Sequence, residues 1–194
     1  MNKPKVKGDE MEYRKTVILK DGSSCLLRNG TAADGQALLD IFILTHAETD
    51  YLLTYADECT MTAEDEAKYL AEKTEDPRSI EILAERDGQL VGSAGIEVVR
   101  DREKLRHRAE FGISVVRACW GLGIGRALAD ACIECAREAG YAQLELDVVV
   151  ENVRAIALYQ SLGFVEWGRN PKGFRTRDGR WQELVLMRLE LGEE

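Results

Sequence analysis

The feature that most constrains this chain is a glycine series, Trp120-Gly121-Leu122-Gly123-Ile124-Gly125, between an apolar run and a helical pattern. The apolar run is residues 111–116, and residues 127–136 repeat small apolar side chains with a helical period. A strand, a turn and a helix N-terminus in this order point unpaired backbone N–H groups and the positive end of a helix dipole at one place. Glycine also lets the backbone approach a ligand without interference from a Cβ atom. The series therefore predicts a site for an anion such as a phosphate.

Upstream of the series, the patterns predict several strands and a pair of helices. Asp87-Gly88 is a strong signal for a two-residue turn between antiparallel strands. Thr31 and Thr62 each precede a helical apolar period and are predicted to cap helices, with an irregular loop at residues 45–60 between them. The strands expected before the series are residues 25–28, 79–85, 89–99 and 107–116.

Downstream of the series, a second strand is expected beside the first. Residues 144–150 form a β-rich run that would return parallel to residues 107–116, in a right-handed βαβ unit around the series. Asn152 is predicted to cap a further helix. Two closing strands are expected at residues 164–167 and 181–191, with a loop at residues 170–180 between them.

Composition excludes several classes of protein. The hydrophobic fraction of 45% and the charged fraction of 31% are typical of a globular α+β domain. No apolar run has the length of a membrane helix, and residues 1–15 lack the apolar segment of a secretory signal, so we expect a cytoplasmic protein with no membrane contact. The net charge of −9 argues against nucleic-acid binding, and it fits either a cationic substrate or simply a soluble acidic surface. We expect a flexible arm over residues 1–20 and a single domain over residues 21–194.

The cysteines predict neither a disulfide framework nor a metal site. Their number is odd, and Cys132 and Cys135 lie within a helical pattern, where they are expected to be small buried groups. With His46 and His107 as the only histidines and no second ligand pair, we predict no metal.

Two known phosphate-binding turns fit the glycine series poorly. A P-loop requires a lysine after its last glycine, and Arg126 stands there. A dinucleotide-binding turn requires its third glycine at the same position, and it occurs near the start of a parallel sheet. Asp147 does lie near the distance expected of the acidic residue in such a fold. A nicotinamide-dependent oxidoreductase therefore remains as a distant alternative.

A third phosphate-binding turn matches closely. Residues 109–115 with 120–128 resemble motif A of GCN5-related N-acetyltransferases (GNAT), and residues 144–164 resemble motif B of the same family. Trp120 departs from the family pattern, which has Gln or Arg there, and is similar to the branch that acetylates ribosomal proteins, small amines and amino-acid-like toxins. The resemblance implies a GNAT-like single domain: a mixed, mostly antiparallel sheet with a central splayed pair of parallel strands and flanking helices.

The resemblance also implies acetyl-CoA as cosubstrate and a set of binding residues. The pantetheine arm would lie between the two parallel strands, and the pyrophosphate would rest on the backbone of the glycine series. Arg126 is equally a surface arginine of its helix, and Asn152 is a helix cap that would additionally hydrogen-bond the cosubstrate. The implied set is Ile113, Val115, Gly121, Leu122, Gly123, Ile124, Gly125, Arg126 and Asn152.

Two catalytic residues follow from the resemblance. Tyr159 matches the tyrosine that protonates the departing thiolate in many relatives, and its alternative is a core tyrosine. Glu110 is the candidate general base, directly or through water, on a strand face with Gly112 and Ser114 that is otherwise an ordinary solvated face. His107 is a weaker candidate.

The implied function is transfer of an acetyl group to a primary amine of a small molecule or a protein N-terminus, by direct attack. The acceptor pocket is expected from the loops at residues 45–60 and 170–180, with Glu48, Asp50 and Tyr51 as possible holders of an ammonium group. The alternative is a non-catalytic domain that binds acetyl-CoA as a sensor. A homodimer is compatible with such a fold.

Overall fold

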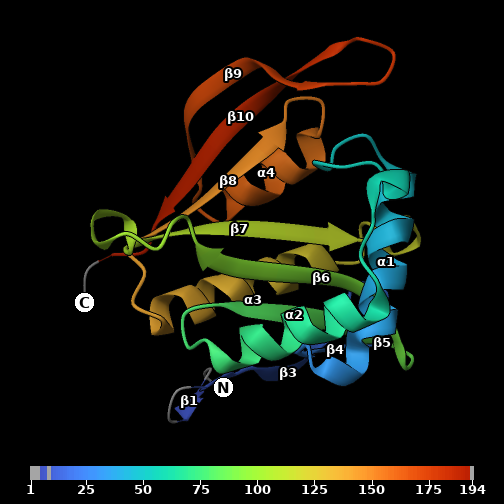
Figure 1. The fold of residues 1–194 in the computed structure, drawn as a ribbon, viewed down its shortest axis with the longest axis vertical. Coiled ribbons are helices and arrows are strands. Elements are labelled where there is room, and N and C mark those ends of the chain that lie inside the picture. The colour runs from blue at the N-terminus through green and yellow to red at the C-terminus, as the bar shows by residue number, and fades with distance from the viewer. Residues whose placement is uncertain (1–4, 8–9, 193–194) are drawn as a thin grey trace.

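The computed structural model describes residues 5–7 and 10–192. Its main sheet has eight strands in the order β3-β4-β5-β6-β7-β8-β10-β9 (Figure 1), and β1 and β2 form a separate two-stranded sheet. Within the main sheet, only β7 and β8 are parallel neighbours. The strands are β1 (Lys5–Lys7), β2 (Glu10–Glu12), β3 (Arg14–Ile18), β4 (Ser24–Asn29), β5 (Ile80–Arg86), β6 (Gln89–Val98), β7 (Arg108–Val115), β8 (Gln143–Val149), β9 (Val165–Arg175) and β10 (Trp181–Glu190).

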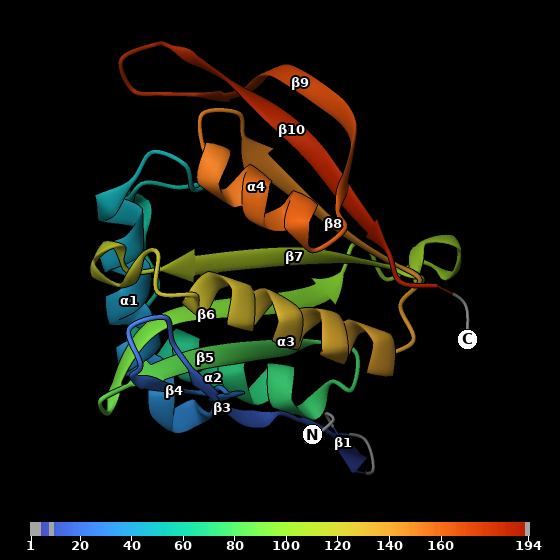
Figure 2. The same cartoon turned by 180° about the vertical axis from the view of Figure 1, so that it is seen from behind.

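The helices cover both faces of this sheet. Figure 1 shows α1 (Gly35–Glu48) and α2 (Ala63–Glu75) on one face. Figure 2 shows α3 (Ile124–Glu138) on the opposite face and α4 (Val153–Ser161) beside β8 and β10 on that side. The predicted α+β domain with a mostly antiparallel mixed sheet is therefore confirmed. No helix of the described chain combines the length and the apolar character that crossing a membrane requires.

The helix α3 packs on the sheet through small side chains. Leu128, Ala131, Cys132, Cys135 and Ala136 have no exposed surface. The cysteines are free thiols, and burial raises the pKa of both Cys132 and Cys135. They act as apolar packing groups, as the helical pattern indicates.

The parallel strands β7 and β8 separate shortly after they meet. Their pairing extends only from Arg108–Glu110 on β7 to Gln143–Glu145 on β8. Beyond Glu110 the two strands diverge (Figure 1), so that residues 111–115 have no backbone partner on the β8 side among the described residues. This is the splayed pair that the sequence predicts.

Three boundaries differ from the sequence expectations. Residues 14–18 pair with β4 and belong to the sheet rather than to the arm expected over residues 1–20; the charged Arg14 and Lys15 obscured the strand pattern. The helix α1 continues to Glu48 instead of ending before the expected loop at residue 45, and Thr45 Oγ1 donates to the Ile41 carbonyl at 2.8 Å within it.

The third difference is the late loop. Most of the expected loop at residues 170–180 is strand, because β9 extends to Arg175 and pairs with β10. Pro171 is tolerated because β9 is an edge strand, whose outer backbone groups need no partner. A Cβ atom at Gly173 would lie 2.3 Å from Leu184 Cγ, so this glycine allows the close strand pairing.

Candidate active site

The glycine turn presents free backbone donors at the start of α3. Gly121 has φ +84° and Gly123, the residue that precedes α3, has φ +101°, a left-handed conformation that favours glycine. The Lys20 backbone N–H donates to the Leu122 carbonyl at 3.0 Å and ties the turn to the β3–β4 connection. The backbone N–H groups of residues 121–126 donate to no acceptor within the described residues. They are therefore available to an anion, as the sequence predicts.

These donors open into a cavity of about 480 Å³, which we call the glycine-turn cavity. Its charged lining consists of Lys20, Arg126 and Arg154 with one carboxylate, Glu151. An excess of cations beside free N–H groups fits a polyphosphate such as the tail of acetyl-CoA. The predicted residues that line this cavity are Ile113, Val115, Gly121, Gly123, Gly125, Arg126, Asn152 and Tyr159. Leu122 and Ile124 are absent from its lining and contribute only their backbone to the turn.

Trp120 has a specific place beside the turn. Its indole N–H donates to the Val115 carbonyl at 2.6 Å, where β7 ends. The guanidinium groups of Arg117 and Arg154 lie 5.4 Å and 5.3 Å from the centroid of the Trp120 ring. These distances are typical of cation–π contacts. Trp120 thus takes the position of the family's Gln or Arg and holds two cations near the cavity.

The helix α4 forms the other wall. The Asn152 side-chain oxygen accepts from the Ala155 N–H at 3.3 Å, so the predicted cap is confirmed. Its amide nitrogen donates to no described residue and remains available on the cavity wall. Arg126 donates to Ser161 Oγ at 2.9 Å and joins α3 to α4.

Tyr159 lies at the inner part of the same wall. Only 7% of the surface of Tyr159 is exposed to solvent. Its ring packs against the rings of Phe111 and Phe164, with centroid distances of 6.1 Å and 5.7 Å. The hydroxyl has no hydrogen-bond partner among the described residues, and Tyr159 lines the glycine-turn cavity. Burial raises the pKa of Tyr159, so the phenol keeps its proton at neutral pH.

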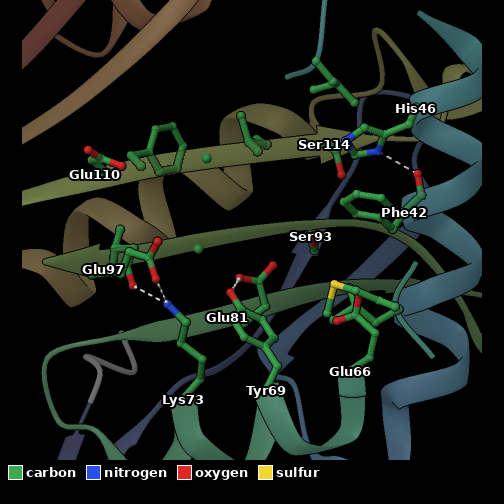
Figure 3. A pocket seen from close by; sticks show the side chains of 18 residues that line it. Phe42, His46, Glu66, Tyr69, Lys73, Glu81, Ser93, Glu97, Glu110 and Ser114 are labelled. Carbon is green, nitrogen blue, oxygen red and sulfur yellow. Dashed lines mark hydrogen bonds and ion pairs between the residues drawn. The ribbon is translucent and has the colours of Figure 1, made fainter. Parts of the chain in front are cut away.

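A second cavity, of about 440 Å³, lies on the other face of the sheet, under α1 and α2. We call it the α1–α2 cavity (Figure 3). It shares three lining residues with the glycine-turn cavity, namely Leu52, Ile113 and Ser114, so the two cavities meet at the outer end of β7. Glu110 lines the α1–α2 cavity and Tyr159 lines the glycine-turn cavity, with β7 between them.

The floor of the α1–α2 cavity follows from strand register. Glu81 on β5 pairs with Gly95 on β6, which pairs with Gly112 on β7, and the two glycines leave space above the sheet. One row away, Glu97 pairs with Glu110. The predicted face of Glu110, Gly112 and Ser114 thus lines the α1–α2 cavity, and Glu110 and Gly112 are also open to solvent.

The environment of Glu110 raises its pKa. Partial burial is the largest cause, and the carboxylates of Glu97, Glu145 and Asp147 add to it, while Arg100 opposes them. A carboxyl whose pKa lies closer to neutrality is better suited to accept a proton from an ammonium group.

Several other sequence expectations are wrong in detail. His107 lies outside both cavities. Neither Glu48 nor Asp50 lines either cavity, whereas Tyr51 lines the glycine-turn cavity. The Glu48 carboxylate instead accepts a hydrogen bond from the Arg117 N–H at 2.7 Å. The tip of the β9–β10 hairpin contributes nothing to either cavity; Arg177 instead forms an ion pair with Asp57.

Six polar residues of the α1–α2 cavity were missed: Glu66, Tyr69, Lys73, Glu81, Ser93 and Glu97. Strand alternation was a usable signal for Glu81, since Ile80, Ile82 and Ala84 define the opposite, buried face of β5. The three residues of α2 follow a helical spacing that also describes an ordinary packing face, so the sequence offered no separate signal for them.

Comparison with known proteins agrees with this geometry. The model of the acetyltransferase (GNAT) family matches residues 43–164. The L-amino acid N-acyltransferase MnaT of Escherichia coli (strain K12) is 32% identical over 112 residues, which cover 58% of this chain and 64% of that enzyme, slightly under two thirds of its length. The [ribosomal protein bS18]-alanine N-acetyltransferase of the same strain is 35% identical over 105 residues, covering 54% of this chain and 67% of that enzyme.

A solved structure resembles the whole fold. It is yncA, a putative acetyltransferase from Salmonella typhimurium with its cofactor acetyl-CoA, with a TM-score of 0.77 at 25% identity. The match covers 87% of this chain and 94% of that chain. Since the family model spans more than half of the sequence, and its range includes both the glycine turn and the splayed strands, the chain belongs to the acetyltransferase (GNAT) family.

Proposed function

We propose that this protein transfers the acetyl group of acetyl-CoA to a primary amine of a small molecule or of a protein N-terminus. The observation that supports this best is the meeting of two cavities at β7. One cavity has free N–H groups and an excess of cations for the phosphates, and the other has a carboxyl with a raised pKa, Glu110, on its floor.

The cosubstrate would lie along the glycine-turn cavity. Its pyrophosphate would accept hydrogen bonds from the backbone of residues 121–126, with Arg126 and Arg154 adding charge. The pantetheine arm would use the backbone groups of Ile113 and the N–H of Val115, which the divergence of β7 and β8 leaves open, while the Val115 carbonyl stays bonded to the Trp120 indole. Asn152 would donate from its free amide nitrogen.

The chemistry would be direct attack of the amine on the thioester carbonyl. Glu110, directly or through water, would take the proton that the amine loses, so that a neutral nitrogen forms the new C–N bond. When the tetrahedral intermediate collapses, the C–S bond breaks and the thiolate leaves. Tyr159 would give its proton to that thiolate, since its phenol remains protonated at neutral pH. The attacking nitrogen keeps a second proton after the C–N bond forms and would return it to the Tyr159 phenolate, directly or through water, so that the products are a neutral amide and the CoA thiol.

The names of the relatives support an amine acceptor without choosing one. One relative is an L-amino acid N-acyltransferase and another acts on the alanine of a ribosomal protein. In both acceptors the primary amine is attached to the carbon next to a carbonyl group, but the two acceptors differ greatly in size. We therefore limit the proposal to a primary amine.

The test is release of free thiol from acetyl-CoA with a panel of amino acids, alkylamines, diamines and peptides. We expect thiol release with at least one amine, together with a mass increase of that amine by one acetyl group. Calorimetry with acetyl-CoA and with NAD provides the separate binding result. Binding of acetyl-CoA with no transfer to any amine would instead support a sensor, and binding of NAD alone would reject the family mechanism.

Within the enzyme, Glu110→Gln tests the base. We expect turnover to fall about 100-fold, the lower range for a general base, with little change in acetyl-CoA affinity. The matched control is Glu103→Gln, since Glu103 is an exposed acid outside both cavities. Equal turnover of wild type and Glu110→Gln would remove Glu110 from the mechanism.

A further inference from the structure

The α1–α2 cavity contains more negative charge than the proposed chemistry uses. Its acidic lining residues are Glu66, Glu81, Glu97 and Glu110, and Lys73 is its single ammonium group. His46, from α1, also faces it, and burial lowers the pKa of His46 so that the ring favours its neutral form. Lys73 Nζ lies 2.8 Å from a Glu97 carboxylate oxygen and neutralises that acid. If Glu110 is the base, two carboxyls of the lining, those of Glu66 and Glu81, have no ion pair within the described residues, although the charge of Lys73 also acts on Glu81.

Glu66 is the first of these. It lies in the first turn of α2, and only 4% of its surface is exposed. Within the described part of the chain, its carboxyl makes no hydrogen bond and no ion pair, although it lines the cavity. Burial raises the pKa of Glu66, and the nearby Asp65 adds to the effect. The carboxyl oxygens are not fully enclosed by protein atoms, so they open into the cavity, where a cation can reach them.

Glu81 is the second. Its side chain lies against Gly95, where a Cβ atom would be 2.2 Å from a Glu81 carboxyl oxygen, so the glycine makes room for the acid. The Tyr69 hydroxyl donates to Glu81 at 3.2 Å. Burial raises the pKa of Glu81 to about 7, and Glu66 contributes to that rise. Hydrogen bonds from Ser93 and Tyr69 and the charge of Lys73 oppose this rise in the pKa of Glu81. Glu66 therefore lies close enough to Glu81 for its charge to act on it.

The remaining walls are apolar and aromatic. They include Leu38 and Phe42 from α1, Leu52 and Met61 from the following loop, and the ring of Tyr69 from α2. Figure 3 shows Glu66 and Tyr69 on α2 with Glu81 on the strand beside them, while Ser114, a residue shared with the glycine-turn cavity, lies on the far side with His46. Apolar walls with acids at one end suit an alkyl chain that carries a positive charge.

We propose, on the basis of the proposed function, that the acceptor carries two amino groups, and that Glu66 and Glu81 bind the ammonium group that is not acetylated. The alkyl chain lies against Phe42, Leu52 and Met61, and the second amine lies over Gly112, between Glu110 and Ser114 on β7. The ammonium supplies the missing partner of Glu66 through charge-assisted hydrogen bonds. An acceptor whose carboxylate enters the same cavity is rejected by repulsion from these acids.

The test compares diamines with monoamines. The α,ω-diamines from trimethylenediamine to hexamethylenediamine are each titrated by calorimetry into the protein saturated with CoA, beside the alkylamine of the same carbon chain. We expect at least one diamine to bind at least tenfold more tightly than its matched alkylamine. No preference for any diamine in the series would overturn the proposal in the wild-type protein, without any need for a variant.

Two variants locate the effect. Glu66→Gln and Glu81→Gln keep the shape of each side chain and remove its charge, and each is expected to reduce the diamine preference at least fivefold. The matched control is Glu64→Gln, because Glu64 is an exposed acid on the same helix. Retention of the full preference in both Glu66→Gln and Glu81→Gln would show that the charge acts elsewhere and would reject this site.

The outcomes also separate this proposal from the proposed function. If diamines bind with the expected preference and are not acetylated, the cation site stands and the acetyl transfer fails. If monoamines are acetylated as well as diamines, the transfer stands and the cation site fails. Acetyl-CoA affinity is expected to be the same in all these variants, since none of the substituted residues lines the glycine-turn cavity.

Discussion

Glu97 on β6 and Glu110 on β7 are directly paired across the two antiparallel strands. Two like charges in such a pair repel each other, and this pair persists because the ammonium group of Lys73 lies 2.8 Å from Glu97. Lys73 is largely buried, with 10% of its side chain exposed, whereas the Glu97 side chain is 61% exposed. Glu110 has no such partner in the part of the chain that the structure describes, and its pKa is raised by burial first and by Glu97 second.

This pairing predicts the effect of Glu97→Gln on pH dependence. A general base is active when it is deprotonated, so turnover should rise with pH through the pKa of Glu110. Removing the Glu97 charge lowers that pKa, and the acidic side of the pH–rate profile should move to lower pH. The measurement is kcat over a pH series with saturating substrates. The Glu103→Gln profile should superimpose on the wild type; an unmoved profile for Glu97→Gln would separate Glu110 from the rate-determining proton transfer.

Gly123→Ala tests the glycine turn. At φ +101° an alanine is strained by about 1–2 kcal/mol, and its methyl group would stand on the wall of the glycine-turn cavity. We expect the dissociation constant of acetyl-CoA to increase about tenfold or more, equivalent to about 1.4 kcal/mol.

Gly140→Ala is the matched control for that substitution. Gly140 follows α3 with φ +76°, and a Cβ atom there meets nothing within 4 Å. Both variants should lose similar stability in urea unfolding, and only Gly123→Ala should lose affinity for acetyl-CoA. Equal affinities in the two variants would contradict the phosphate site at the turn.

The glycine turn was predictable because every element of it is local. Its strand, its glycines and its helix follow one another within residues 111–136, so periodicity and turn chemistry define them without knowledge of the rest of the fold. The free N–H groups then follow from helix geometry alone.

The α1–α2 cavity was not predictable in the same way. It depends on the register that brings Glu81, Gly95 and Gly112 into one row, and on the position of α2 above that row. The register between β6 and β7 follows a connection at residues 99–107 that contains no two-residue turn to define it. The extent of β9 was also missed, because Pro171 and Gly173 are typical loop residues in a sequence. Their place in a strand depends on the pairing with β10, which the local sequence does not specify.

Tyr159→Phe tests the proposed acid. The substitution removes a hydroxyl that has no partner in the described residues and keeps the packing against Phe111 and Phe164. Stability should therefore be unchanged within about 0.5 kcal/mol, while turnover falls about 100-fold. Tyr141→Phe provides the contrast: it loses a hydrogen bond of 2.8 Å to the Arg78 carbonyl, at a cost of about 1 kcal/mol, with no effect on turnover. Equal turnover of Tyr159→Phe and wild type would reject the role of Tyr159 as proton donor and would indicate that it only packs in the core.

Glu81→Gln should change how stability depends on pH. The pKa of Glu81 is about 7 in the folded protein, against an ordinary value of 4.5, so the folded state binds the proton more tightly between these values. The contribution of Glu81 to the free energy of unfolding is therefore fully present below pH 4.5 and is lost as pH rises through about 7. Glutamine does not titrate, so the variant should gain on the wild type as pH rises, by about 3 kcal/mol at most.

The measurement is urea unfolding of wild type and Glu81→Gln at intervals between pH 5 and pH 8. The difference between the two free energies of unfolding should change steadily in favour of the variant over this range. In Glu64→Gln, whose exposed acid lies on α2 outside both cavities, the difference from wild type should stay constant. A constant difference for Glu81→Gln as well would mean that Glu81 is ionised throughout, as it would be if a cation already occupied the α1–α2 cavity.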